Sequence, residues 1–223
     1  MRIARAALVL ICTASLGACA ASHVSTDAPP GISLAGEWRL NPAKSDDPQK
    51  VLAQMRERAH KIMAAAAGGA PHGAGPEAGG PPEGAGAPPP GAGPRHDPLQ
   101  RSPMAHIVEA VLARGDYLDV HQNANEMVFD FGTSRRNFVP GAKSVVSTEG
   151  GVGDQVSGWH GRDFVIVVRP QNGPEVTERI GLSPDGKQLI DALHIAQYEL
   201  PAVDLRRVYD PASSVPRQVP TAD

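Results

Sequence analysis

Cysteine and aromatic residues are scarce in this sequence. Two of its 223 residues are cysteine, and 4% are aromatic. Both cysteines, Cys12 and Cys19, fall within the first 19 residues, so the rest of the chain has no thiol for a disulfide, a zinc site or a catalytic nucleophile. Its stability must therefore come from packing alone. The 24 Gly and 22 Pro indicate that much of the chain is not packed, and the remainder suits one globular domain with a modest core.

Motifs that identify a reaction are also missing. Residues 181–187 have the G-x-x-x-x-G-K spacing of a phosphate-binding loop, but Gln188 replaces the magnesium-binding Ser or Thr, and the spacing lies in a predicted hairpin turn. No G-x-S-x-G occurs, and the eight histidines are not spaced as metal ligands. The formal net charge is -3, with no basic patch that would indicate nucleic acid. We therefore expect no enzyme activity, no catalytic residue, no metal, no cofactor and no nucleic-acid partner.

The N-terminus has the three parts of an export signal. Residues 1–18 carry Arg2 and Arg5 near their start, continue with an apolar stretch too short to span a bilayer permanently, and end in small residues. The L-G-A-C at residues 16–19 resembles the lipobox of bacterial lipoproteins, which implies that lipid such as palmitate is attached to Cys19. The following Ala20 implies that the anchored protein is located at the outer membrane and faces the periplasm. Residues 19–32 would be the lipidated cysteine and a short tether. The alternative is an ordinary secretory signal with a chance cysteine.

The strand-like segments between residues 154 and 195 are the centre of the predicted sheet. Residues 164–168 are an unbroken run of β-branched and aromatic side chains between turn formers, which predicts a strand buried on both faces. In the next segment Val176, Ile180 and Leu182 share one face of a period-two pattern. The connections are too short for crossovers, so neighbouring strands must be antiparallel.

Two helices interrupt the sheet pattern after its first strand. Residues 33–40 alternate, with Trp38 on the apolar face. Helices are then expected near 48–66 and 103–113, and the Gly/Pro/Ala-rich residues 67–98 between them are expected to be disordered, because they cannot bury enough apolar surface. We expect the apolar stripe of the first helix to cover one side or the mouth of the sheet. Its polar face carries both signs of charge, which disfavours a membrane-surface helix.

Further strands are predicted between the second helix and the central segments, and one more after them. They are expected at 117–122, 127–131, 135–139, 143–148 and 203–209. Residues 33–212 therefore form a single, mainly β domain, followed by a flexible tail at 213–223. The pattern is that of an antiparallel up-and-down barrel, or a curved half-barrel, of about 8–10 strands.

The chain contains the stretches GEWRLNPAKSDD, SGWHGRDFVIVV, ERIGLSPDGKQLI and LRRVYD. Their combination resembles a large group of uncharacterised secreted and lipid-anchored proteins of Gram-negative bacteria, in which a tryptophan-bearing first strand precedes a β-meander. The resemblance covers roughly residues 33–47 and 116–210, implies a lipocalin-like shape and brings no known activity. The triplet GEW resembles the G-x-W of lipocalins, which place an arginine of the last strand across that tryptophan. The resemblance implies that Arg207 lies across Trp38 in this way.

Six residues are candidates for contact with a ligand. The aromatic candidates, each of which is also expected as ordinary core, are Trp38, Phe129, Phe131 and Trp159. Glu178 and Arg207 also lie among apolar neighbours, and a buried charge needs a partner. The sequence leaves open whether these two pair inside the barrel, line a polar spot in a pocket, face solvent near a strand end, or form a purely structural pair.

Two functions are compatible with these patterns. The first is an outer-membrane lipoprotein with a lipocalin-like domain that binds an apolar or amphipathic ligand in the periplasm. The second is a non-enzymatic envelope module with a filled barrel, which uses its helices, edge strands or Gly/Pro-rich insert to contact another envelope protein. A hollow interior would favour the first function, and a filled interior the second.

Overall fold

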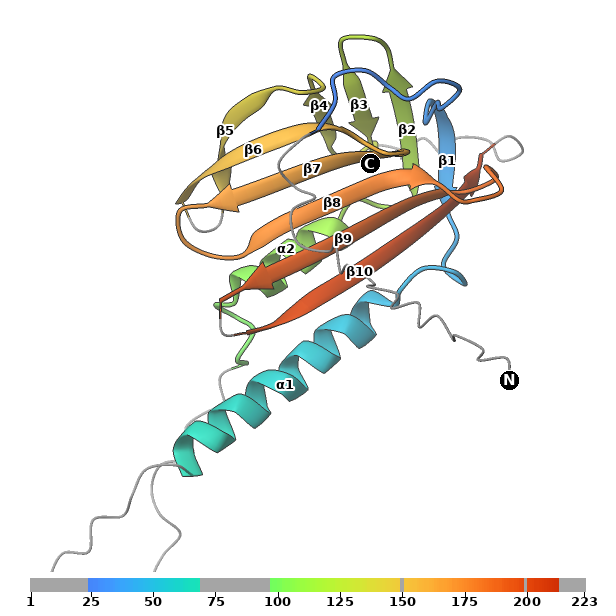
Figure 1. Ribbon diagram of the computed structural model, residues 1–223. Helices are drawn as coiled ribbons and strands as arrows, with labels where there is room; N and C mark the ends of the chain where they lie inside the picture. Colours follow the sequence, from blue (N-terminus) through green and yellow to red (C-terminus); the bar gives the residue numbers. More distant parts are fainter. Residues whose placement is uncertain (1–23, 69–96, 149–150, 199, 213–223) are drawn as a thin grey trace, which may run out of the picture.

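The computed structural model describes residues 24–68, 97–148, 151–198 and 200–212. Its strands form one ten-stranded sheet with the order β4-β3-β2-β1-β10-β9-β8-β7-β6-β5 (Figure 1). The strands are β1 Gly36–Leu40, β2 Tyr117–Gln122, β3 Met127–Asp130, β4 Arg135–Phe138, β5 Lys143–Thr148, β6 Gly151–His160, β7 Asp163–Pro170, β8 Glu175–Leu182, β9 Leu189–Gln197 and β10 Leu200–Pro211. The helices are α1 Pro48–Gly68 and α2 Pro103–Leu112.

Every pairing in the sheet is antiparallel, as short connections require. The first and last strands are neighbours, with Leu40 opposite Tyr209. By contrast β4 and β5 follow one another in the chain but lie at opposite ends of the strand order, and no pairing joins them within the described residues. The sheet therefore curls into a half-barrel with an open seam between β4 and β5, which confirms the predicted fold class.

The central strands have the predicted faces. Phe164 to Val167 of β7 are all buried, so this strand is covered on both sides. In β8, Glu178 and Ile180 are buried on the inner face, and Leu193 of β9 lies opposite Glu178. The turn before β9 is stabilised by Ser183, whose hydroxyl lies 2.5 Å from Asp185 Oδ1. This turn is a hairpin connection, as the sequence indicated for the G-x-x-x-x-G-K spacing.

The two helices lie between β1 and β2 in the chain and have clear start signals. The Asp47 carboxylate accepts a hydrogen bond from the amide of Gln49, and the Ser102 hydroxyl accepts one from the amide of Ala105. A proline then occupies the first position of each helix, where its missing N–H costs nothing. Both helices lie where the sequence pattern placed them.

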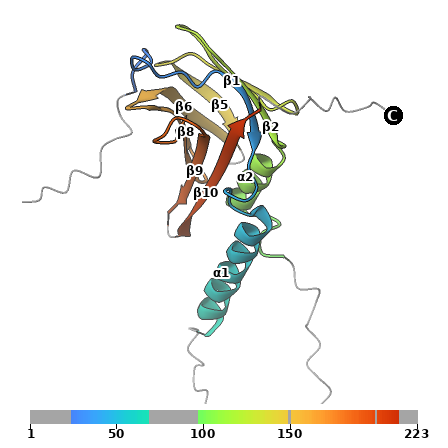
Figure 2. The same cartoon turned by 90° about the vertical axis from the view of Figure 1, so that its right-hand side faces the viewer.

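The second helix, rather than the first, covers the concave side of the sheet (Figures 1 and 2). Its Val108 packs in one cluster with Ile195 and Val203, and its Val111 packs with Leu193 and Leu205. Helix α1 contacts the domain through its first half and then leads away from it (Figure 2). Helix α1 therefore packs on one side of the domain, one of the two positions expected for it, whereas α2 covers the concave face.

Besides the small cluster of Val111, Leu193 and Leu205, two larger apolar cores of the described residues fill different ends of the half-barrel. One joins α2, the start of α1 and strands β9 and β10. The other is aromatic, and Phe129 and Phe164 lie in it with ring centroids 5.9 Å apart. These two rings come from β3 and β7, which are far apart in the strand order, so the contact crosses the interior. The predicted leader at 1–18, the lipid-attachment residue Cys19 and the tail at 213–223 lie outside the described residues, as does most of the insert.

Candidate functional site

A cavity of about 490 Å³ lies between α2 and the inner face of the sheet. Most of its wall is apolar, formed by Ile107, Ala110, Val111, Ile166, Val168, Pro170, Pro174, Val176 and Leu193. Arg136 of β4 and Ser147 and Thr148 of β5 also line it, so the cavity extends to the open seam. A concave, mainly apolar site of this size with a few polar groups is typical of small-molecule binding.

The polar part of the wall is centred on Glu178, which is 2% exposed. Its two carboxylate oxygens accept hydrogen bonds from different guanidinium groups, Arg114 Nη1 at 2.5 Å and Arg136 Nη1 at 2.6 Å. Burial alone would raise the pKa of Glu178, but the charges and hydrogen bonds of Arg114 and Arg136 outweigh it and lower the pKa to about 2. Glu178 is therefore ionised and lines the cavity together with both arginines.

A second carboxyl group lies behind Arg114 and away from the cavity wall. Asp191 of β9 is 1% exposed, and its Oδ2 lies 3.4 Å from Arg114 Nη1. Its Oδ1 has no hydrogen-bond partner within the described part of the chain. Burial, followed by the charge of Glu178, raises the pKa of Asp191 to about 7. Because the two carboxyl groups titrate as a pair, the better bonded Glu178 holds the negative charge, and Asp191 holds the proton below about pH 7.

Arg207 of β10 anchors the end of α2. It is 4% exposed and donates hydrogen bonds to the carbonyl oxygens of Val111 and Gly115. Val111 lies in the last turn of α2 and Gly115 follows its end, so the guanidinium complements the partial negative charge at the C-terminus of this helix. Arg114 ties the same end of α2 to β8 through Glu178. Two arginines thus hold α2 against the sheet.

These contacts answer the question that the sequence left open about Glu178 and Arg207. Glu178 is buried in a polar spot of a cavity, so a solvent-facing position is wrong. Its partners are Arg114 and Arg136, and the pairing with Arg207 is also wrong. Arg207 does not lie across Trp38 either, since its guanidinium lies over the ring of Tyr209, 5.5 Å from the centroid.

The aromatic candidates fill the interior rather than line the cavity. Trp38, Phe129 and Trp159 belong to the aromatic core, and none of them is among the residues that line the cavity. The indole of Trp38 donates a hydrogen bond to the carbonyl oxygen of Leu34, 3.1 Å away. Phe131 belongs to the same core and lies beneath Arg114, whose guanidinium carbon is 5.1 Å from the ring centroid. The half-barrel is therefore filled at its aromatic end and hollow under α2.

Three charged or titratable residues around Glu178 were missed by the sequence reasoning, two in the cavity wall and one behind it. Asp191 alternates with Leu189 and Leu193, which is the same signal that identified Glu178, so it was available from the pattern. Arg136 alternates in the same way with Phe138. Arg114 follows the end of α2, and only the docking of that helix brings it to the cavity.

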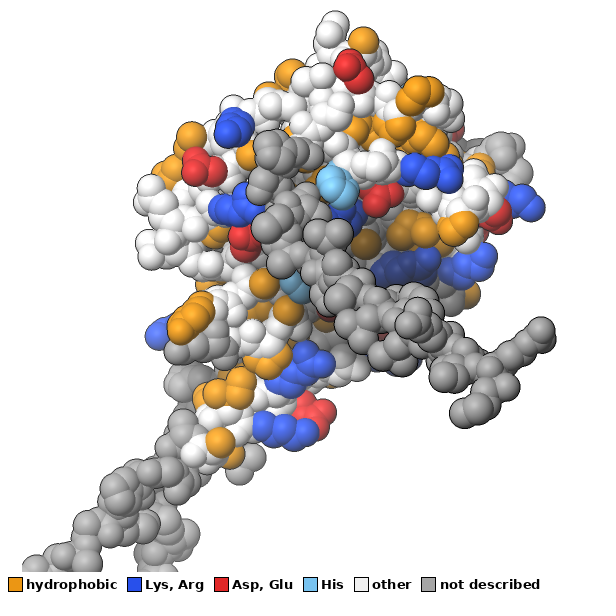
Figure 3. All heavy atoms as spheres, viewed as in Figure 1, with side chains coloured by type: hydrophobic (Ala, Val, Ile, Leu, Met, Phe, Trp, Pro, Cys, Tyr) orange, Lys and Arg blue, Asp and Glu red, His pale blue; other side chains and the backbone are white. Residues whose placement is uncertain are grey.

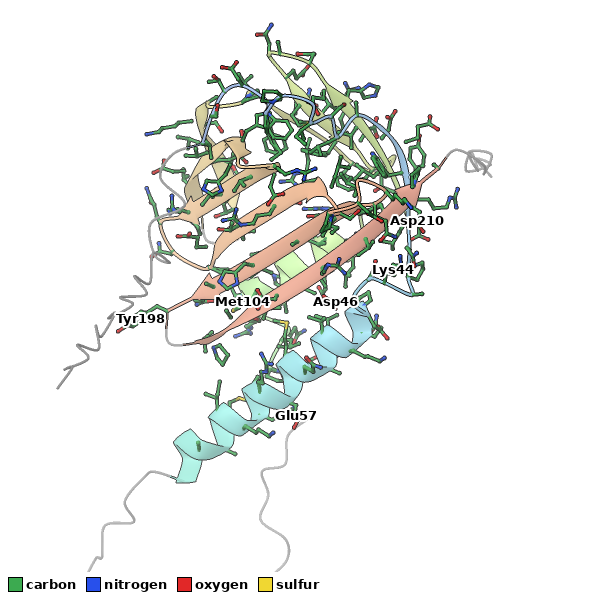
Figure 4. The ribbon with its side chains drawn as sticks, turned by 45° about the vertical axis from the view of Figure 1, so that its right-hand side comes forward. Lys44, Asp46, Glu57, Met104, Tyr198 and Asp210 are labelled. Atoms are coloured by element: carbon green, nitrogen blue, oxygen red, sulfur yellow. The ribbon has the colours of Figure 1, made fainter. Side chains whose placement is uncertain are left out.

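A smaller apolar groove of about 230 Å³ lies beside α1. It is lined by Met55, Arg58, Ala59, Ile62, Met63, Pro98, Leu99, Ser102, Met104, Leu200, Pro201 and Val203. Figure 3 shows hydrophobic side chains along α1 and at the adjoining end of the sheet. Figure 4 places Met104 between the sheet and α1, and Tyr198 at the end of β9, where it points away from the sheet with 88% of its surface exposed.

Within the described ranges, no three His, Cys, Asp or Glu side chains are grouped so that they could hold a metal ion. None of the helices in that part of the chain is long and apolar enough to cross a membrane. The polar wall of the cavity is thus made of arginine, carboxyl and hydroxyl groups, which can bind a charged or polar group by ion pairs and hydrogen bonds.

No family model matches this chain, and no curated protein matches it in sequence. Among solved structures it is similar to apo lipid binding protein 8 of Caenorhabditis elegans, with a TM-score of 0.45 and 12% identity over 81% of this chain and 99% of that one. It is also similar to the fatty acid-binding protein of Drosophila melanogaster brain (TM-score 0.39, 14% identity, 80% and 99% covered). A third similarity is to the zebrafish ileal bile acid-binding protein (TM-score 0.34, 17% identity, 48% and 84% covered). With identities and TM-scores this low, these similarities carry no conclusion about what this chain binds.

Proposed function

We propose that this protein binds an amphipathic small molecule without transforming it. The apolar part of the ligand lies in the cavity under α2, and a negatively charged group lies at Arg114 and Arg136. The observation that carries this proposal is the hollow, mostly apolar space with two guanidinium groups in one wall. Each methylene group buried there would contribute about 0.8 kcal/mol, so a chain of about ten methylene groups would contribute about 8 kcal/mol against the cost of association.

The charge of the polar wall favours an anionic ligand. Arg114 and Arg136 carry two positive charges, whereas Glu178 carries one negative charge. Asp191 keeps its proton up to about neutral pH because burial and Glu178 raise its pKa to about 7. One positive charge in this wall is therefore unbalanced, and a charge removed from water is costly unless it is paired. An anionic headgroup at the seam side of the cavity, where Arg136 is 26% exposed, would balance it.

The cellular setting is part of the proposal and depends on the sequence. The lipobox-like residues 16–19 support lipid attachment at Cys19, and the following Ala20 supports anchoring in the outer membrane with the domain in the periplasm. Metabolic labelling with an alkyne-bearing palmitate tests this directly. Label is expected on the wild-type chain and not on Cys19→Ser, and equal labelling of both would contradict the anchor.

Native mass spectrometry tests the binding function. The full chain carrying Cys19→Ser is expected to retain a small-molecule adduct that organic extraction removes. Ala110→Trp fills the cavity from α2 and is expected to lose the adduct, because Ala110 lines the cavity and is exposed. Ala64→Trp on the exposed part of α1 is the matched control and is expected to retain it. An adduct that survives in Ala110→Trp would contradict binding in this cavity.

One observation favours the second function, an envelope interaction module. Ile62 and Met63 of α1 are 44% and 48% exposed, and Leu200 at the start of β10 is 41% exposed. Exposed apolar residues next to a groove are typical of contact sites. Under this alternative, Ile62→Glu with Met63→Glu would abolish cross-links to a specific envelope protein in cells. The ligand-binding function predicts that the same double variant keeps its adduct in the mass spectrum.

A further inference from the structure

Asp191 is the buried titratable group that the proposed binding site does not use directly. Its Oδ1 has no partner among the described residues, and its Oδ2 makes one long contact with Arg114, at 3.4 Å. The charged and titratable groups that act on it come from every element around it: Arg136 on β4, Arg114 after α2, Glu178 on β8, and Arg207 and Tyr209 on β10. The hydroxyl of Tyr209 likewise lacks a hydrogen-bond partner within the described part of the chain.

Two carboxyl groups thus share one guanidinium. Arg114 Nη1 lies 2.5 Å from Glu178 Oε1 and 3.4 Å from Asp191 Oδ2. Glu178 has a second guanidinium, Arg136, while Arg207 is occupied by the carbonyl oxygens of Val111 and Gly115. Of the two carboxyl groups, Asp191 is therefore the one whose ionised form is poorly satisfied and whose proton is easily retained.

We propose that ionised Asp191 and the anionic group of the ligand compete for the positive charge of Arg114 and Arg136, so that ligand binding is coupled to uptake of one proton by Asp191. This inference rests on the proposed function. When Asp191 is ionised, the group formed by Arg114, Arg136, Glu178 and Asp191 has no net charge, and a bound anion makes it negative. When Asp191 is protonated, the same group carries one positive charge, which the bound anion balances.

The charges balance in the coupled reaction. Ionised Asp191, one proton from solvent and the free anion give protonated Asp191 and the bound anion. The affinity is then nearly constant at low pH and decreases tenfold per pH unit once free Asp191 is ionised. Since burial and Glu178 raise the pKa of Asp191 to about 7, the affinity for an anion is expected to fall about tenfold between pH 6 and pH 8.

Isothermal titration calorimetry with decane-1-sulfonate tests the coupling, because this probe stays ionised over the whole range. The protein is the full chain with Cys19→Ser, titrated at pH 6, 7 and 8 in buffers of different ionisation enthalpy. We expect about tenfold weaker binding at pH 8 than at pH 6, with close to one proton taken up per ligand at pH 8. Decan-1-ol, which carries no charge, is expected to bind with the same affinity at each pH.

Two matched variants locate the proton. Asp191→Asn is expected to show an affinity for the sulfonate that does not change with pH. Asp204→Asn makes the same chemical change on the exposed face of β10, where Asp204 lies 2.7 Å from His194, and is expected to keep the tenfold change. The coupling would be overturned if the affinity for the sulfonate were equal at pH 6 and pH 8, or if its pH dependence persisted in Asp191→Asn. Neither result would contradict the proposed binding site. Failure of both probes to bind at pH 6 would overturn the coupling together with the proposed function.

Discussion

Replacing Glu178 by glutamine is expected to destabilise the protein strongly. The substitution keeps the size of the side chain but removes the charge between Arg114 and Arg136, which are bonded to it at 2.5 and 2.6 Å. Breaking a buried ion pair by removing one partner costs about 3–5 kcal/mol. Arg114 would keep Asp191 at 3.4 Å, but Arg136 would have no carboxylate partner among the described residues. The lowered pKa of Glu178 indicates a loss of folding free energy of the same magnitude. A shift from 4.5 to about 2 corresponds to about 3 kcal/mol at 1.36 kcal/mol per pKa unit.

The sign of the pH dependence follows from this lowered pKa. The stabilisation by ionised Glu178 is fully present above its unfolded pKa of 4.5, and it is lost as the pH falls toward about 2. Urea denaturation of the wild type and Glu178→Gln is therefore expected to give a difference of about 3 kcal/mol at pH 7 that shrinks below pH 4.

An exposed ion pair between β7 and β8 provides the control. Glu175 lies 3.0 Å from Arg169, and both side chains are more than two-fifths exposed. Glu175→Gln is expected to cost less than about 1 kcal/mol, because solvent screens such pairs. Equal and small costs for Glu175→Gln and Glu178→Gln would refute the assignment of Glu178 as the buried centre of the polar wall.

Three further predictions concern Asp191, Arg207 and Phe129. Because the pKa of Asp191 is raised, the native state keeps this proton between about pH 4 and 7, whereas the unfolded state loses it. The free energy of unfolding of the wild type is therefore expected to fall as the pH rises over that range. Urea denaturation is expected to show a smaller fall in Asp191→Asn. Arg207→Met removes the hydrogen-bond donors to the end of α2. Amide hydrogen exchange in residues 103–112 is therefore expected to accelerate, while the amides of β7 stay protected. Unchanged exchange in residues 103–112 would contradict the anchoring role of Arg207. Phe129→Ala empties part of the aromatic core and is expected to lower the free energy of unfolding by about 3–5 kcal/mol, measured by thermal or urea unfolding. The affinity for decane-1-sulfonate is expected to stay the same. A lost affinity would place the ligand among the aromatic residues.

Local pattern was sufficient to predict most of the fold. Period-two alternation and short polar turns fixed the strands and their antiparallel order, because each strand is specified by its own residues and each turn by its neighbours. The buried position of Glu178 was also predictable, since it alternates with Val176 and Ile180. The helix starts were predictable from Asp47 and Ser102 for the same local reason.

The partners of Glu178 were not predictable, because they depend on the curl of the sheet and on helix docking. Arg136 lies on β4 and Glu178 on β8, at distant places in the strand order, so only the closing curvature brings them together. Arg114 reaches Glu178 because α2 lies on the concave face. The same curvature brings Phe129 and Phe164 into contact and fills one end of the interior, which no single strand pattern contains.

Mapping of a bound amphiphile by NMR tests the central claim most directly. Amide shifts of the full chain with Cys19→Ser are recorded during titration with decane-1-sulfonate at pH 6. Binding in the cavity under α2 predicts that the largest changes occur at Ile107, Arg136, Thr148, Ile166 and Val176, with saturation at one ligand per chain. Changes confined to Ile62, Met63 and Leu200 beside α1, or no saturable change at any residue, would contradict it.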